Sequence, residues 1–83
     1  MKITIKECEK FSSRVCAELK RLRLERGLSQ QTLANMVGLS RGCVQHLESG
    51  IRNPSLVVIY GLTTAMGVPL EKVIRKAARY KED

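Results

Sequence analysis

Residues 27–55 read GLSQQTLANMVGLSRGCVQHLESGIRNPS, and their pattern is the most informative in the chain. Ser29 and Ser40 each precede a short amphipathic pattern, and serine is a preferred N-cap residue. Gly38 lies between the two patterns, where a left-handed residue can turn the chain sharply. Two short capped helices joined by a glycine corner predict a helix-turn-helix, an arrangement typical of proteins that bind duplex DNA.

The size and charge of the chain agree with a small binding module. Its 83 residues make one domain with little core left over for a catalytic cleft, so we expect no enzyme and no catalytic residues. Lysine and arginine together number 15 against eight acidic residues, which gives a net charge of +7. That charge favours polyanionic partners, nucleic acid first and an acidic membrane second, without choosing between them.

The sequence carries no signal for export or membrane insertion. No apolar run approaches the roughly 18 residues that span a bilayer, and the start MKITIKECEK lacks the apolar stretch of a secretory signal. The three cysteines are an odd number and are expected to be reduced thiols. Cys8 and Cys16 would lie about 12 Å apart on one helix, too far for a disulfide. We therefore predict a cytoplasmic protein without a membrane partner.

Cys43 and His46 have a spacing that could supply two metal ligands from one helix. Zinc usually takes four ligands, and the chain has no second pair with suitable spacing. We therefore predict no metal, no cofactor and no small-molecule effector.

Apolar periodicity predicts further helices on both sides of the opening stretch. A first helix that ends at Gly27 turns these residues inward: Phe11, Val15, Leu19 and Leu22. Residues 1 to about 6 are expected to be an extension of uncertain shape. A fourth helix, capped by Ser55 and ending at Gly67, has as its expected inner side Leu56, Ile59, Leu62, Ala65 and Met66. A last helix after Pro69 has an apolar face and a basic one, the apolar face being Leu70, Val73, Ile74 and Ala77.

The outward side of the helix that follows Ser40 is polar, as a helix that enters the major groove should be. Its residues are Arg41, Gly42, Gln45, His46 and Ser49. Arg41 is expected to contact DNA, whereas His46 could equally well only solvate the helix surface. In the next loop, Arg52, Asn53 and the N–H groups of the helix that Ser55 caps predict a phosphate clamp. The alternative for Arg52 is a solvated loop charge.

The fourth predicted helix leaves little polar surface, because Val57, Val58, Tyr60 and Gly61 lie outside its inner side. An apolar outer face on a small domain favours contact with a second subunit. We predict that Val57, Tyr60 and Gly61 lie in a dimer interface.

The segment LKRLRLERGLSQQTLANMVGLSRGCVQHLESGIRNPSL, residues 19–56, resembles the Cro and lambdoid-phage repressor family, often called the XRE family. The likeness continues through LTTAMGVPLEKVI and covers roughly residues 15–74. The resemblance implies an all-α bundle of five helices, a homodimer on a two-fold operator, and transcriptional regulation. It divides the chain into residues 1–13, an extension and the start of the first helix; 14–68, the helix-turn-helix domain; and 69–83, a basic helix for dimerisation or flanking contacts.

The resemblance also assigns roles to single residues. Arg41, Gly42, Gln45 and His46 match positions that approach base edges, where Arg pairs with guanine and Gln with adenine. Gly42 stands where a larger polar residue is common in this family. Either the backbone approaches the DNA closely at this position, or the position has drifted. Cys43 fills space or touches a thymine methyl group. The resemblance assigns a phosphate contact to Gln30, and we expect further phosphate contacts from Ser40, Arg52, Asn53 and Ser55. Arg23 and Glu48 match a structural ion pair, and Gln30 can also brace the third helix.

The function that these features predict is a dimeric, sequence-specific DNA-binding regulator, a repressor that also controls its own promoter. A restriction–modification controller and an antitoxin are alternatives that the sequence does not separate. A hypothesis of another class is a protein-interaction adaptor with only non-specific DNA affinity.

Overall fold

The computed structural model describes residues 2–51 and 53–79 of the chain. It contains five helices: α1 (Ile5–Glu25), α2 (Gln30–Val37), α3 (Arg41–Glu48), α4 (Leu56–Met66) and α5 (Leu70–Ala78). No strand occurs in these two ranges. The predicted all-α fold of five helices is therefore confirmed.

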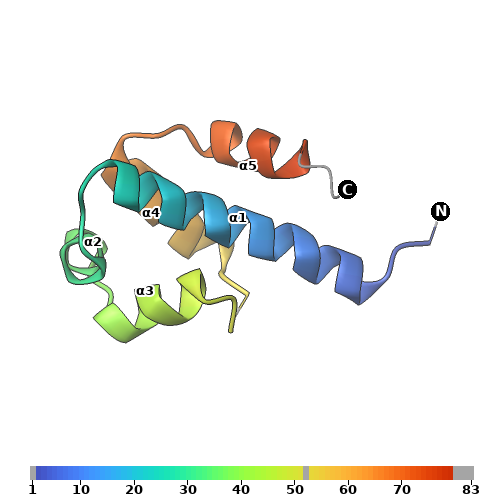
Figure 1. The fold of residues 1–83 in the computed structure, drawn as a ribbon, viewed down its shortest axis with the longest axis horizontal. Helices are drawn as coiled ribbons and strands as arrows, with labels where there is room; N and C mark the ends of the chain where they lie inside the picture. The colour runs from blue at the N-terminus through green and yellow to red at the C-terminus, as the bar shows by residue number, and fades with distance from the viewer. Residues whose placement is uncertain (1, 52, 80–83) are drawn as a thin grey trace.

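The long helix α1 is the axis of the molecule (Figure 1). It packs against α3, α4 and α5, while α2 packs against α3 and α4. In the view of Figure 1, α5 lies along one side of α1 and α3 along the other. The helix-turn-helix formed by α2 and α3 is thus held against one side of α1.

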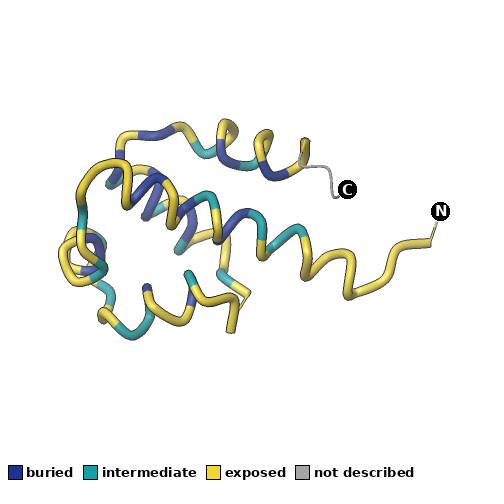
Figure 2. The backbone as a smooth tube through the Cα atoms, in the orientation of Figure 1, coloured by how far each residue is buried: buried dark blue, intermediate teal, exposed yellow. Residues whose placement is uncertain are grey.

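The core is built from one apolar face of each helix, and Figure 2 shows the buried segments turned towards the middle of the bundle. Its fully buried side chains include Leu19, Leu33, Leu62, Val44 and Val73, one from each helix. Thr63 is also buried, and its hydroxyl donates to the Ile59 carbonyl within α4 at 3.0 Å. Each helix thus adds at least one fully buried side chain to a shared core.

The first helix begins earlier than the sequence analysis expected. Thr4 is its N-cap: the Thr4 hydroxyl accepts from the Glu7 backbone N–H at 3.2 Å, and the Glu7 carboxylate accepts from the Thr4 N–H at 3.4 Å. This reciprocal capping box satisfies two N–H groups that a helix start leaves open. The extension of uncertain shape expected over residues 1 to about 6 is helical from Ile5 onward. The expected range 1–13 included the start of the first helix, and its end at residue 13 lies within α1.

A second correction concerns Leu56, which was expected on the inner side of α4 but is 65% exposed. The buried stripe of α4 consists of Ile59, Leu62, Thr63 and Met66. Leu56 is the first residue of the helix and lies beyond the end of that stripe.

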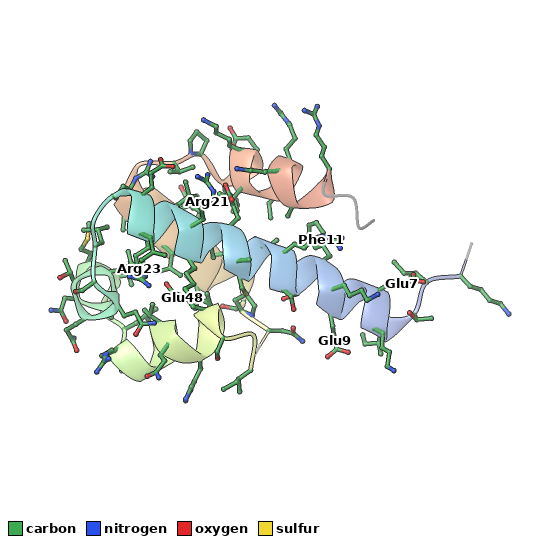
Figure 3. All side chains as sticks on the ribbon, in the orientation of Figure 1. Glu7, Glu9, Phe11, Arg21, Arg23 and Glu48 are labelled. Carbon is green, nitrogen blue, oxygen red and sulfur yellow. The ribbon has the colours of Figure 1, made fainter. Side chains whose placement is uncertain are left out.

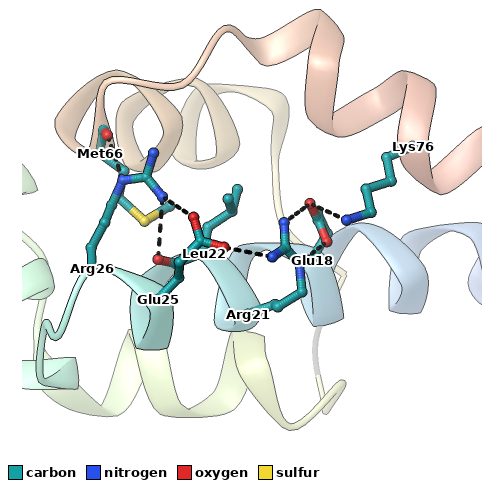
Figure 4. Close-up of polar contacts among 7 residues, drawn as sticks. All are labelled: Glu18, Arg21, Leu22, Glu25, Arg26, Met66 and Lys76. Carbon is teal, nitrogen blue, oxygen red and sulfur yellow. Dashed lines mark hydrogen bonds and ion pairs between the residues drawn. The ribbon is translucent and has the colours of Figure 1, made fainter.

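Arginine side chains on α1 and at its C-cap attach the helix to its neighbours. The Arg26 Nε donates to the Met66 carbonyl at the end of α4 at 2.9 Å (Figure 4). The Arg14 Nε likewise donates to the Ala77 carbonyl near the end of α5 at 3.2 Å. Carbonyls at a helix C-terminus have no partner within the helix and carry partial negative charge, so a guanidinium is a suitable donor there.

An ion-pair cluster also joins α1 to α5 (Figure 4). The Arg21 guanidinium contacts Glu18 at 2.8 Å and Glu25 at 2.8 Å, and the Lys76 ammonium lies 3.4 Å from Glu18. The hydrogen bond from Arg21 is the main cause that lowers the pKa of Glu18 from its ordinary value, and the positive charges of Arg21 and Lys76 lower it further. Glu18 therefore stays ionised in the folded protein to a lower pH than an isolated glutamate.

Candidate nucleic-acid interface

The corner between α2 and α3 has a defined backbone geometry. Gly38 adopts the left-handed conformation with φ 71°, and the Leu39 N–H donates to the Ala34 carbonyl at 2.9 Å. Ser40 then caps α3 by accepting from the Cys43 N–H at 3.1 Å. Ala34 is completely buried, and its small side chain allows the two helices to approach closely. These contacts fix the direction in which α3 leaves the turn.

The polar residues predicted to face outward on α3 do so. Arg41, Gln45, His46 and Ser49 are exposed, whereas Val44 and Leu47 are buried against the other helices. Gly42 and Cys43 are half-buried. The helix therefore offers one polar face to solvent, along the side of α1 opposite α5 (Figure 1).

A buried ion pair holds α3 against α1. The Arg23 guanidinium binds both oxygens of the Glu48 carboxylate, with Nε–Oε2 at 2.6 Å and Nη2–Oε1 at 2.9 Å. Figure 3 shows the two side chains pointing toward each other from α1 and α3. Only 8% of the Arg23 side chain and 4% of the Glu48 side chain are exposed. This two-pronged geometry is the strong form of an arginine–carboxylate contact.

The same carboxylate also receives a bond from α2. The Gln30 Nε2 donates to Glu48 Oε1 at 3.1 Å, and Arg23 Nη1 donates to the Leu28 carbonyl at 2.7 Å in the loop before α2. Throughout the described residues, no buried side-chain nitrogen or oxygen lacks a hydrogen-bond partner. Arg23, Gln30 and Glu48 therefore form one network that fixes α1, α2 and α3 relative to one another. The bracing role expected for Gln30 is thus visible in the structure.

Two of the other residues expected at phosphates, Ser40 and Ser55, occupy helix starts. The Ser40 and Ser55 hydroxyls are the N-caps of α3 and α4, and Ser55 accepts from the Val58 N–H at 3.2 Å. Asn53 is exposed in the loop before α4, and Arg52 lies outside the described residues. The structure thus brings the expected base-contact residues together on α3, while Asn53 and Ser55 lie on the segment that follows it.

The outer face of α4 is apolar at its N-terminal end. Leu56, Val57 and Tyr60 form what we call the α4 patch, and Val57 is the most exposed at 82%. Gly61 follows on the same helix and is half-buried, with Val37 of α2 as its nearest non-neighbouring group. Met36 of α2 and Ile51 of the loop before α4 are also exposed. Sequence reasoning named Val57, Tyr60 and Gly61 but missed Leu56, Met36 and Ile51. Only their exposure in the fold reveals these three.

The basic residues of α5 lie elsewhere. Lys72, Arg75, Lys76 and Arg79 are exposed, and their helix lies across α1 from α3 (Figure 1). Much of the positive charge is therefore carried on a different side of the molecule from the polar face of α3. In residues 2–51 and 53–79, no three His, Cys, Asp or Glu side chains gather as a metal site would require.

The comparisons with known proteins agree with this geometry. The family described as HTH_3, helix-turn-helix, matches residues 19–73, which include all of α2, α3 and α4. The chain belongs to the HTH_3 family. A transcriptional regulator of Sinorhizobium fredii, y4dJ, is 39% identical over 54 residues, which cover 65% of this chain and 70% of that protein. The CTXphi transcriptional repressor RstR of Vibrio cholerae is 31% identical over 64 residues, covering 77% of this chain but 54% of RstR.

Two solved structures share the fold. The restriction–modification controller protein C.AhdI of Aeromonas hydrophila has 40% identity and a TM-score of 0.70, covering 75% of this chain and 94% of that one. The clp gene regulator ClgR of Corynebacterium glutamicum has 25% identity and a TM-score of 0.77, covering 82% and 88%. The family is one of transcription regulators rather than enzymes. Over the described ranges, no single helix is long and apolar enough to cross a membrane; α4 and α5 meet that criterion only as a pair, which is bent by 113°.

Proposed function

We propose that this HTH_3 protein is a sequence-specific regulator that binds double-stranded DNA as a homodimer and represses transcription, including its own. The observation that carries the proposal is the exposed polar face of α3, held by the buried network of Arg23, Gln30 and Glu48. A reading helix must keep its side chains in register with base pairs, so a rigid mounting is what such a helix needs. The regulator acts in the cytoplasm and uses no cofactor and no small-molecule effector.

The base contacts come from α3. Arg41 donates to a guanine through both arms of its guanidinium, and Gln45 pairs with an adenine, each contact discriminating by about 1–3 kcal/mol. The other residues of this base-contact surface are Gly42, Cys43 and His46. Phosphate contacts from Ser40, Asn53, Ser55, Arg52 and the amide end of Gln30 hold the protein on the backbone without reading sequence.

The α4 patch is the dimer interface in this proposal. Exposed large apolar side chains gain free energy when a second copy covers them, and a two-fold dimer would place the same patch on both partners. Gly61 is assigned to the same interface and follows Tyr60 in α4, although a Cβ built on it would lie 3.9 Å from Val37 of α2 in the same chain. In this arrangement two recognition helices face one two-fold operator.

A second candidate is a restriction–modification controller, which activates or represses according to operator occupancy. The likeness to C.AhdI favours it, since it covers 94% of that chain with 40% identity. The two candidates share one DNA-binding mechanism and differ in the layout of the operators. Mapping the sites upstream of the chain's own gene and of its neighbours distinguishes them.

Selection of bound duplexes from a random library at near-physiological salt tests the proposal. The regulator predicts a two-fold motif with half-sites about 34 Å apart. If the bound duplexes share no enriched sequence and their binding weakens strongly with salt, the result would contradict the proposal and favour the adaptor hypothesis. Arg52→Ala is the companion variant: it should weaken binding to all sequences and reduce the salt slope by about 1, leaving the motif unchanged.

A further inference from the structure

Backbone conformation explains why four of the six glycine positions are glycine, but it does not explain the other two. Gly27, Gly38, Gly50 and Gly67 all have positive φ, which side chains of L-residues rarely allow. Gly42 and Gly61 instead lie within the helices α3 and α4. A Cβ built on Gly61 would lie 3.9 Å from Val37 of α2, whereas one built on Gly42 would have no residue of another helix within 4 Å.

The fold itself does not require a glycine at position 42. A Cβ built on Gly42 would have the Ser40 hydroxyl, 4.0 Å away, as its nearest group, which is ordinary contact distance. The conformation of Gly42 is not left-handed, so an alanine would meet no strain there. Glycine is also a poor helix residue because it gives up more backbone freedom than alanine on folding. An alanine at this position would therefore fit the isolated protein at least as well.

The surroundings of Gly42 indicate which molecule would benefit from the missing side chain. Its sequence neighbour Arg41 and the exposed Gln45 belong to the polar face of α3, on which the proposed base contacts lie. We propose that Gly42 determines specificity, because its bare backbone lets the first turn of α3 come into contact with a base-pair edge in the major groove. This inference rests on the proposed DNA-binding function.

The size of a methyl group makes the consequence testable. A carbon added at Gly42 extends about 1.5 Å from Cα, and carbon atoms pack at about 3.5–4.0 Å. If the backbone already touches the base pair, alanine must push the helix outward. Hydrogen bonds from Arg41 and Gln45 work only within about 2.7–3.2 Å, so a shift near 1 Å breaks them. Contacts to phosphates through flexible side chains tolerate that shift better.

The experiment compares Gly42→Ala with the wild-type chain and with Ala78→Gly. The control makes the reverse exchange at an exposed position of α5, across α1 from α3. For Gly42→Ala we expect a Tm that is unchanged or higher by up to about 5 °C. Its affinity for the duplex that the wild type selects should fall at least about fivefold, the lower limit for one lost base contact, and its affinity for random duplex should not change. Ala78→Gly should lower Tm and leave both affinities unchanged.

Three results would overturn the inference. Equal affinity of Gly42→Ala and wild type for the selected duplex would show that no base edge lies against Gly42. A lower Tm of Gly42→Ala, with equal losses on selected and random duplexes, would show that the glycine serves the fold. A wild-type chain that selects no motif would overturn the proposed function and this inference with it, which separates that failure from the first two.

Discussion

Removing one partner of the Arg23–Glu48 pair should destabilise the whole fold. In Glu48→Gln, the Arg23 guanidinium stays buried and loses a counter-charge that it binds at 2.6 and 2.9 Å. Hydrogen bonds to charged groups each contribute roughly 1.5–3 kcal/mol, and breaking a buried pair costs roughly 3–5 kcal/mol. A chain of this length has a free energy of unfolding of about 4–12 kcal/mol. The variant should therefore lose a large part of its stability.

Urea unfolding followed by far-ultraviolet circular dichroism measures this loss, and a double-mutant cycle assigns it. Arg23→Met combined with Glu48→Leu replaces both charges by apolar groups, which often costs little. We expect the loss of stability of the double variant to be smaller, by at least about 1 kcal/mol, than the sum of the losses of Arg23→Met alone and Glu48→Leu alone. Glu25→Gln is the matched control: its exposed ion pair with Arg21 should contribute less than about 1 kcal/mol. Single losses that add to within about 0.5 kcal/mol would show that Arg23 and Glu48 are not coupled.

Three further predictions follow from other contacts. Val57→Glu should convert the dimer to monomers in analytical ultracentrifugation, since Val57 is exposed on the α4 patch. The control Lys72→Glu on α5 should leave the dimer intact. A Val57→Glu chain that still sediments as a dimer would exclude that patch as the interface. The pKa of Glu18 is lowered by Arg21, so Glu18 stabilises the fold above about pH 4.5, its ordinary pKa, and loses that effect as pH falls through its lower folded pKa. The Tm difference between wild type and Glu18→Gln should accordingly shrink with acidification in calorimetry, and a difference independent of pH would contradict the assignment. Burial raises the pKa of the Cys16 thiol, whereas Cys8 is exposed. At pH 8 a thiol reagent should therefore modify Cys8 quickly and Cys16 only when the protein unfolds. Equal rates of modification at the two cysteines would be inconsistent with this packing.

Local chemistry made much of the fold predictable from sequence. The caps Ser29, Ser40 and Ser55 and the turn at Gly38 are decided by groups within four residues of one another, so they can be recognised without the structure. The same holds for the outward side of α3, because helical periodicity alone separates Arg41 and Gln45 from Val44 and Leu47.

Contacts between distant residues were harder to predict. The Arg23–Glu48 pair spans 25 positions and came from the family resemblance rather than from any local pattern. The exposure of Leu56, Met36 and Ile51 depends on where the neighbouring helices end. The hydrophobic periodicity of a single helix does not give that information. The early start of α1 could have been found, because Thr4 and Glu7 have the spacing of a capping box.

The most direct test of the central claim, that α3 reads DNA sequence, is duplex selection repeated with Arg41→Ala. If α3 reads the sequence, wild type yields a two-fold motif, and the variant loses its base preference at one position in each half-site, with the rest of the motif intact. A motif identical to that of the wild type would contradict the role of Arg41, and the absence of any motif from the wild-type selection would contradict sequence reading by α3 altogether.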